Sequence, residues 1–188
     1  MTKLEQRIHS AVLKVHKDYL VMTGYWLSHA PESYITVIIA QEIVKLGYNV
    51  YIDTTLKKIR NDQSKNLNHT KRKLSPLLSK RPDISVVFKA KQQILAAIEV
   101  KRAAKFLNPV RRDTEKLEQL IGGEGGAKYG YVVEYSETKY HENRDTLKER
   151  FAGWATKTSW AVASSHISSL SGDEDRVWGF CILKRQRI

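Results

Sequence analysis

Residues 81–102, RPDISVVFKAKQQILAAIEVKR, constrain the fold of this 188-residue chain more than any other segment. They form two apolar runs separated by a polar turn, with Pro-Asp opening the first run and Glu-Val-Lys closing the second, which is typical of a β-hairpin. Side chains alternate between the two faces of a strand, so Glu99 and Lys101 share one face while Val100 projects from the other. The hairpin therefore predicts that Asp83, Glu99 and Lys101 meet at one point of a sheet.

Helical and strand patterns alternate along the rest of the chain. Apolar residues at helical spacing predict helices over 4–22, 31–47, 111–121 and 143–156. Strand patterns cover 49–54, 129–135, 160–167 and 176–185. The order α-α-β-β-β-α-β-α-β-β favours a mixed α/β (α+β) sheet covered by helices. We expect a single domain over residues 1–188, because the length fits one core and no repeat or linker divides it.

The chain is strongly basic, with a net charge of +12. Such an excess attracts polyanions, of which nucleic acid is the usual one, although charge alone fits a surface kept basic for solubility equally well. The single cysteine, Cys181, excludes an internal disulfide and a cysteine-rich zinc site. No apolar run approaches the length of a membrane span, and the amphipathic N-terminus does not resemble a signal peptide. We therefore expect a cytoplasmic protein with no membrane partner.

A polar, basic segment over residues 57–80 leads into the hairpin. Its Asn and Ser content and Pro76 predict a loop or short helical turns rather than a sheet element. Such a long connection is usually functional or mobile, and its cations suit phosphate contacts that position a duplex without reading its sequence. We favour an arm over nucleic acid, with a solvated loop as the alternative. The candidate nucleic-acid-binding residues are Lys57, Lys58, Arg60, Lys71, Arg72, Lys73 and, behind the hairpin, Arg102.

The three polar residues of the hairpin suit phosphodiester hydrolysis. That reaction needs a metal ion to offset charge at the phosphate and to activate a water molecule. Carboxylates suit Mg²⁺, which takes one or two protein ligands, so Asp83 and Glu99 fit as ligands and the peptide oxygen of Val100 could complete the coordination. A lysine beside them, Lys101, can orient the attacking water or stabilise the developing negative charge.

Pro82-Asp83, fifteen intervening residues and Glu99-Val100-Lys101 together resemble the PD-(D/E)xK nuclease superfamily, which includes many restriction endonucleases and Holliday-junction resolvases. Each short motif also occurs by chance, but the element order matches that family's αβββαβ core over about residues 31–136. The resemblance implies a restriction-endonuclease-like mixed β-sheet flanked by helices. It also implies a Mg²⁺-dependent endodeoxyribonuclease, in which Mn²⁺ can substitute, with the Asp, Glu and Lys of the motif as catalytic residues.

Members of this superfamily often carry a further acid on the helix before the first core strand. Glu32 is the candidate for this additional metal ligand, although an acid in a first helical turn is also favoured by the helix dipole. Glu42 is a weaker candidate on the same helix. On the following helix, Gln119 fits surface solvation and Asp113 fits a cap or dipole partner.

Three functions are consistent with these residues. The leading hypothesis is a metal-dependent DNA endonuclease of the restriction, resolvase or effector type, and a homodimer would suit a cutter of two strands. The second is a nucleic-acid-binding module that has the nuclease fold without turnover, although such a module has no need of the pair Asp83 and Glu99. The third is a ribonuclease on the same scaffold, and nothing in the sequence tests for recognition of the 2′-hydroxyl.

Overall fold

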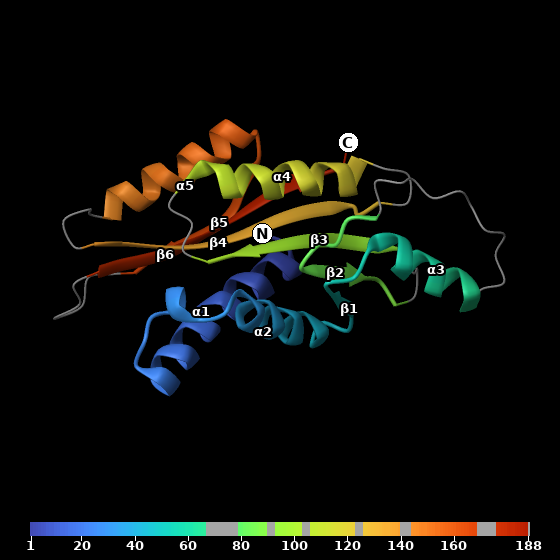
Figure 1. The fold of residues 1–188 in the computed structure, drawn as a ribbon, viewed down its shortest axis with the longest axis horizontal. Coiled ribbons are helices and arrows are strands. Elements are labelled where there is room, and N and C mark those ends of the chain that lie inside the picture. The colour runs from blue at the N-terminus through green and yellow to red at the C-terminus, as the bar shows by residue number, and fades with distance from the viewer. Residues whose placement is uncertain are drawn as a thin grey trace.

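The computed structural model describes residues 1–66, 79–89, 93–102, 106–122, 126–139, 144–168 and 176–187. These residues form a mixed α/β fold in which a six-stranded sheet lies between two layers of helices (Figure 1). The helices are α1 (Lys3–Thr23), η1 (Leu27–His29, a short 3₁₀ helix), α2 (Glu32–Val44), α3 (Leu56–Asn66), α4 (Leu107–Gly122) and α5 (Arg144–Thr158). The strands are β1 (Asn49–Ile52), β2 (Ile84–Val87), β3 (Ile94–Lys101), β4 (Tyr129–Lys139), β5 (Ala161–Ile167) and β6 (Arg176–Gln186). The predicted fold class is confirmed.

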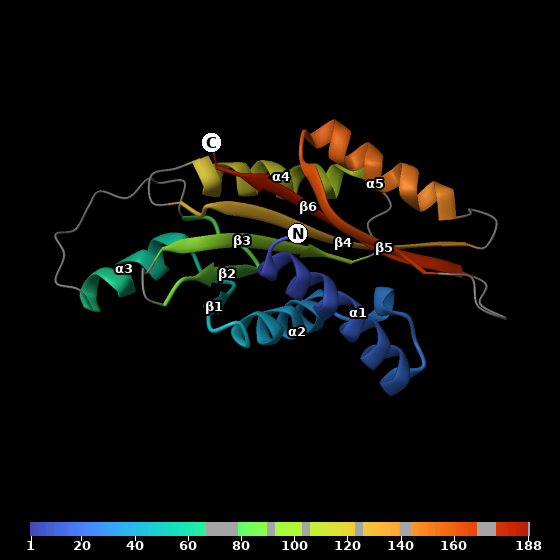
Figure 2. The same ribbon diagram turned by 180° about the vertical axis from the view of Figure 1, so that it is seen from behind.

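The sheet has the strand order β1-β2-β3-β4-β6-β5. β3 and β4 run parallel, and the other neighbouring strands of the described sheet are antiparallel. A parallel pair needs a crossover connection, and α4 supplies it. Helices α4 and α5 cover one face of the sheet while α1 and α2 cover the other, as the views from both sides show (Figures 1 and 2).

The central strands are buried on both faces. Ala96, Ile98 and Val100 of β3 join the core beneath α1 and α2, and Ala97 joins the core beneath α4 and α5. Seven of the eight β3 residues are buried, so β3 has the continuous apolar sequence typical of a strand covered on both sides. Glu99 is the one charged residue among these seven buried residues of β3.

The described elements follow the predicted order, with the short 3₁₀ helix η1 and the helix α3 added. The basic segment was expected to form a loop or short helical turns rather than a sheet element, and residues 56–66 form the helix α3. Leu56 and Ile59 anchor this helix because both are fully buried beside Val87 and Ile94. Lys71, Arg72 and Lys73 lie outside the described residues. Within the described ranges, no helix is both long and apolar enough to cross a membrane.

The buried His16 links α1 to the sheet. Its ring stacks on Trp178 with the centroids 3.7 Å apart, and its Nδ1 lies 3.3 Å from the Tyr135 hydroxyl, which donates to Glu137. Burial lowers the pKa of His16 to about 4, and the positive charge of His166 adds to the effect. The folded chain therefore holds this imidazole neutral.

We expect the contribution of His16 to the free energy of unfolding to fall as the pH is lowered from 7 to 5, while the buried acids with raised pKa values act in the opposite direction. Below the unfolded pKa of 6.5, the unfolded chain binds a proton at His16 that the folded chain does not bind until about pH 4. The resulting loss at pH 5 is about 2 kcal/mol. Urea denaturation at both pH values measures it. On going from pH 7 to pH 5, the free energy of unfolding of the wild type should change by about 2 kcal/mol in the destabilising direction relative to that of His16→Gln. Equal changes in both proteins would contradict the prediction.

Candidate functional site

Asp83 lies directly before β2, at the point where β3 continues past its neighbour. Its Oδ2 accepts a hydrogen bond of 2.7 Å from the backbone N–H of Val100. The carboxylate thus replaces the backbone carbonyl that would accept this hydrogen bond if β2 continued beside β3. Its own carbonyl accepts from the N–H of Asp53 at 3.1 Å, which ties the residue to the end of β1. The N–H and C=O of one strand residue leave the same edge, so the Val100 carbonyl also faces Asp83.

Glu99 is almost completely buried, with 1% of its surface exposed. The Nζ of Lys116, from α4, lies 2.6 Å from its Oε1 in an ion pair whose angles depart from those of a hydrogen bond. Burial raises the pKa of the Glu99 carboxyl to about 8; the Asp83 carboxylate adds to the rise and Lys116 opposes it. Burial also raises the pKa of Asp83, while the Val100 N–H and nearby lysines oppose that shift. Two carboxyl groups that repel each other thus lie close together beneath α4.

Lys101 occupies the end of β3, between the two helical layers. Its Nζ donates to Glu32 Oε1 of α2 at 3.0 Å and lies 3.7 Å from Asp113 Oδ2 of α4. Burial opposes the charge on this lysine, but Asp113 and Glu32 outweigh it and raise the pKa of Lys101. Glu32 Oε2 also accepts from the backbone N–H of Arg102 at 3.4 Å. Lys101 is therefore a fixed, protonated group beside the carboxyl pair.

The structure adds three residues that the sequence did not indicate for the site: Asp113, Lys116 and Glu134. Asp113 was expected to cap a helix, but α4 begins at Leu107, so Asp113 lies inside the helix and faces Lys101. Burial raises the pKa of Asp113 to about 6, while Lys101 opposes the rise. The spacing of Asp113 and Lys116 is the signal that could have found them, because residues three apart share a helix face.

Glu134 is the third addition. It pairs with Lys101 in the parallel register and is fully buried. Within the part of the chain that the structure describes, neither of its carboxyl oxygens has a hydrogen-bond partner. Burial raises the pKa of Glu134, and the charge of Asp113 adds to the rise. A lone acid in the apolar run YGYVVEY was the available sequence signal.

The remaining candidates lie away from the carboxyl pair or in other contacts. Glu42 forms ion pairs with Arg7 and Lys45. Arg102 donates to the carbonyl of Ser28 at 2.7 Å. Lys57, Lys58 and Arg60 belong to α3, which lies at the opposite end of the sheet from η1 and the start of α2 (Figure 1).

The donor set fits a hard divalent cation. Mg²⁺ takes one or two carboxylates and keeps several waters, and Asp83, Glu99 and the Val100 carbonyl offer that number of oxygens. A cation would also relieve the repulsion between the two acids, although Lys116 already offsets part of it. Among the residues that the structure describes, no three His, Cys, Asp or Glu side chains gather as a metal-binding group. Glu32, the predicted additional ligand, accepts a hydrogen bond from Lys101.

Comparison of the chain with known protein families, with curated proteins and with solved structures gives no match. The chemistry of the site follows from its own geometry. It combines the buried Glu99 carboxyl and the partly buried Asp83 carboxyl with a protonated lysine at the end of two neighbouring strands. These groups can bind a cation and stabilise negative charge that develops beside it.

We expect Lys116→Met to lower the free energy of unfolding by about 1 to 3 kcal/mol, because Glu99 then loses its ion-pair partner while still buried. Arg111→Met on the same helix is the matched control. Arg111 pairs with Glu115 at 3.6 Å, but both side chains are more than half exposed, so this change should cost less than about 0.5 kcal/mol. Urea denaturation at pH 9, where the Glu99 carboxyl with its pKa of about 8 is ionised, measures both, and equal losses would show that the Lys116–Glu99 pair does not stabilise the fold.

Proposed function

We propose that this chain is a divalent-metal-dependent DNA endonuclease of the PD-(D/E)xK type. The observation that carries the proposal is the hydrogen bond from Val100 to the Asp83 carboxylate, with Glu99 and Lys101 on either side of Val100 in β3. It joins the two halves of the motif at one end of the sheet. The order α2, β1, β2, β3, α4, β4, with α3 inserted between β1 and β2 and with β3 parallel to β4, supports a restriction-endonuclease-like core.

Each residue has a distinct role in this proposal. Asp83 and Glu99, with the Val100 carbonyl, would hold Mg²⁺, or Mn²⁺ in its place; the ion would offset phosphate charge and make a bound water nucleophilic at neutral pH. Lys101 binds a phosphate oxygen, because its raised pKa keeps the ammonium protonated. Glu32 and Asp113 are positioning residues, since they hold Lys101 from opposite sides of the sheet.

The net charge of +12 supports a polyanionic substrate. DNA is the substrate we propose, with RNA as the competing substrate on the same site. A homodimer would bring two such sites to the two strands of a duplex.

One observation favours the alternative, a non-catalytic nucleic-acid-binding module. The Lys116 ammonium lies 2.6 Å from Glu99 and offsets the charge that a metal ion would otherwise offset. In a binding module this lysine would be a permanent substitute for the cation. In an endonuclease it would have to give way when the metal binds.

We expect cleavage of DNA to require Mg²⁺ or Mn²⁺ and to stop in a chelator. The test uses linear duplex, supercoiled, branched and single-stranded DNA, with RNA as a further arm. Asp83→Asn keeps an oxygen that can accept from Val100 but removes the charge, and Lys101→Met removes the ammonium. Each should reduce the cleavage rate by at least roughly 10²-fold. Lys148→Met, on the exposed side of α5, is the lysine control. Undiminished cleavage by both purified site variants would overturn the proposal.

We expect Lys116→Met to bind a divalent ion more tightly than the wild type. The ion then no longer competes with the ammonium for Glu99, and the gain should be roughly tenfold in the dissociation constant. Calorimetric titration of Mg²⁺ or Ca²⁺ measures it, with Arg111→Met as the control. An absence of divalent-ion binding in both the wild type and Lys116→Met would favour the binding module over the endonuclease.

A further inference from the structure

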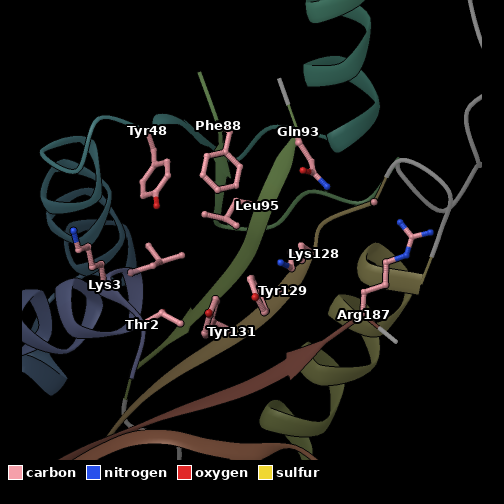
Figure 3. Close-up of a pocket in the computed structure, with 12 residues that line it drawn as sticks. Thr2, Lys3, Tyr48, Phe88, Gln93, Leu95, Lys128, Tyr129, Tyr131 and Arg187 are labelled. Carbon is pink, nitrogen blue, oxygen red and sulfur yellow. The ribbon is translucent and has the colours of Figure 1, made fainter. Parts of the chain in front are cut away.

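α1 and α2 cover only part of their face of the sheet, and a cavity of about 570 Å³ opens on the part that they do not cover (Figure 3). It lies where β3 begins, because the N–H of Lys128 in its wall donates to the carbonyl of Ile94. Glu99 follows Ile94 by five residues, so the cavity and the carboxyl pair are separated by roughly 17 Å along the strand. The cavity is therefore distinct from the site described above.

Aromatic rings form one part of the cavity wall. Tyr48 follows α2 and Phe88 follows β2, and their ring centroids lie 5.4 Å apart at an interplanar angle of 72°. Both rings pack against the core yet stay partly exposed. Figure 3 shows the two rings side by side above Leu95. Partly exposed rings that are anchored from below can stack against a planar ligand.

Positive charge lies on both sides of these rings. Lys3 belongs to the α1 side of the cavity, while Lys128 and Arg187 belong to the β4–β6 side (Figure 3). All three residues are exposed, and none of the described residues that line the cavity is Asp or Glu. The nearby Glu5 is already paired, since its Oε1 lies 2.7 Å from the Nζ of Lys184.

The positive potential extends beyond the cavity to α3. Burial lowers the pKa of Arg60, and the like charge of Arg187 adds to the effect. The charges of Arg60 and Arg187 are thus close enough to repel each other. Lys128 and Lys184 also lie 5.2 and 4.9 Å from the ring centroid of Tyr129. Cations and aromatic rings together form this end of the sheet.

We propose that the cavity binds one nucleotide unit of a single-stranded nucleic acid. The unpaired base lies against Tyr48 and Phe88, and its two flanking phosphates lie near Lys3 and near Lys128 with Arg187. A single nucleic-acid strand supplies a planar base with a phosphate on each side, which a free mononucleotide does not supply. A duplex is a poorer ligand because its bases are stacked inside the helix. The volume is within the range of ligand pockets.

Fluorescence anisotropy with a labelled single-stranded oligothymidylate tests the proposal. The full chain is used in a chelator, so that the result does not depend on cleavage or on a metal ion. Tyr48→Leu and Phe88→Leu keep apolar volume but remove the ring, and each should weaken binding by about 5-fold to 100-fold. Tyr25→Leu is the control, because Tyr25 is 62% exposed and lies outside the cavity wall. Thermal unfolding confirms that each variant is folded.

The charges are tested by the salt dependence of binding. The double variant Lys128→Ala, Arg187→Ala should reduce the slope of log K against log salt by about 1.4, whereas Lys148→Ala, Lys157→Ala should leave it unchanged. Free thymidine monophosphate and inorganic phosphate serve as competitors. If free thymidine monophosphate displaces the labelled oligonucleotide at the same nucleotide concentration as the unlabelled oligonucleotide does, the proposal that the cavity binds a nucleic-acid strand is overturned. Wild-type affinity in folded Tyr48→Leu and Phe88→Leu would overturn the site itself and leave the proposed endonuclease untouched.

Discussion

The parallel pairing of β3 with β4 is the constraint on which the candidate site depends. The other neighbouring strands in the described sheet are antiparallel, so this pair needs a connection that crosses from one end of the sheet to the other. The crossover helix α4 must pack on the face from which Glu99 and Lys101 project. That packing brings Asp113 to Lys101 and Lys116 to Glu99. A requirement of topology thus places two oppositely charged helix residues over the two strand residues.

A contribution to the stability of the fold does not readily explain why these buried acids gather at one place. Burial raises the pKa of Glu99, Asp113 and Glu134, so each acid is less easily ionised in the folded chain than in the unfolded one. Apolar residues of similar size at such positions are often neutral or stabilising. Titratable groups with shifted pKa values gather where a protein binds or reacts. The burial of these acids therefore supports our proposal that a cation and a substrate bind here.

Sequence periodicity predicted most of the fold and the central part of the site. The period of two residues in a strand is enough to place Glu99 and Lys101 on one face, and the antiparallel return of the hairpin is enough to bring Asp83 to them. The full length of α3, beyond the short helical turns expected there, was not predicted because two buried residues, Leu56 and Ile59, anchor it within a polar segment. The partners on α4 and β4 escaped prediction because they depend on how a helix lies across the sheet, which local patterns do not specify.

The two ends of β3 differ in how they would treat a phosphate group. At the C-terminal end of β3, the cations Lys101 and Lys116 are paired with acids. A phosphate would therefore meet carboxyl groups and would need a divalent ion between the phosphate and these groups. At the beginning of β3, Lys128 and Arg187 line a cavity without an acidic wall among the described residues. Under our proposal, a polyanion would be attracted there without a metal ion and would be released as the salt concentration rises. Binding of the nucleic acid would thus depend on monovalent salt and its hydrolysis on a divalent metal ion. The reason is that acids lie among the cations at one end of β3, whereas the charged residues described in the cavity wall at the other end are all cations.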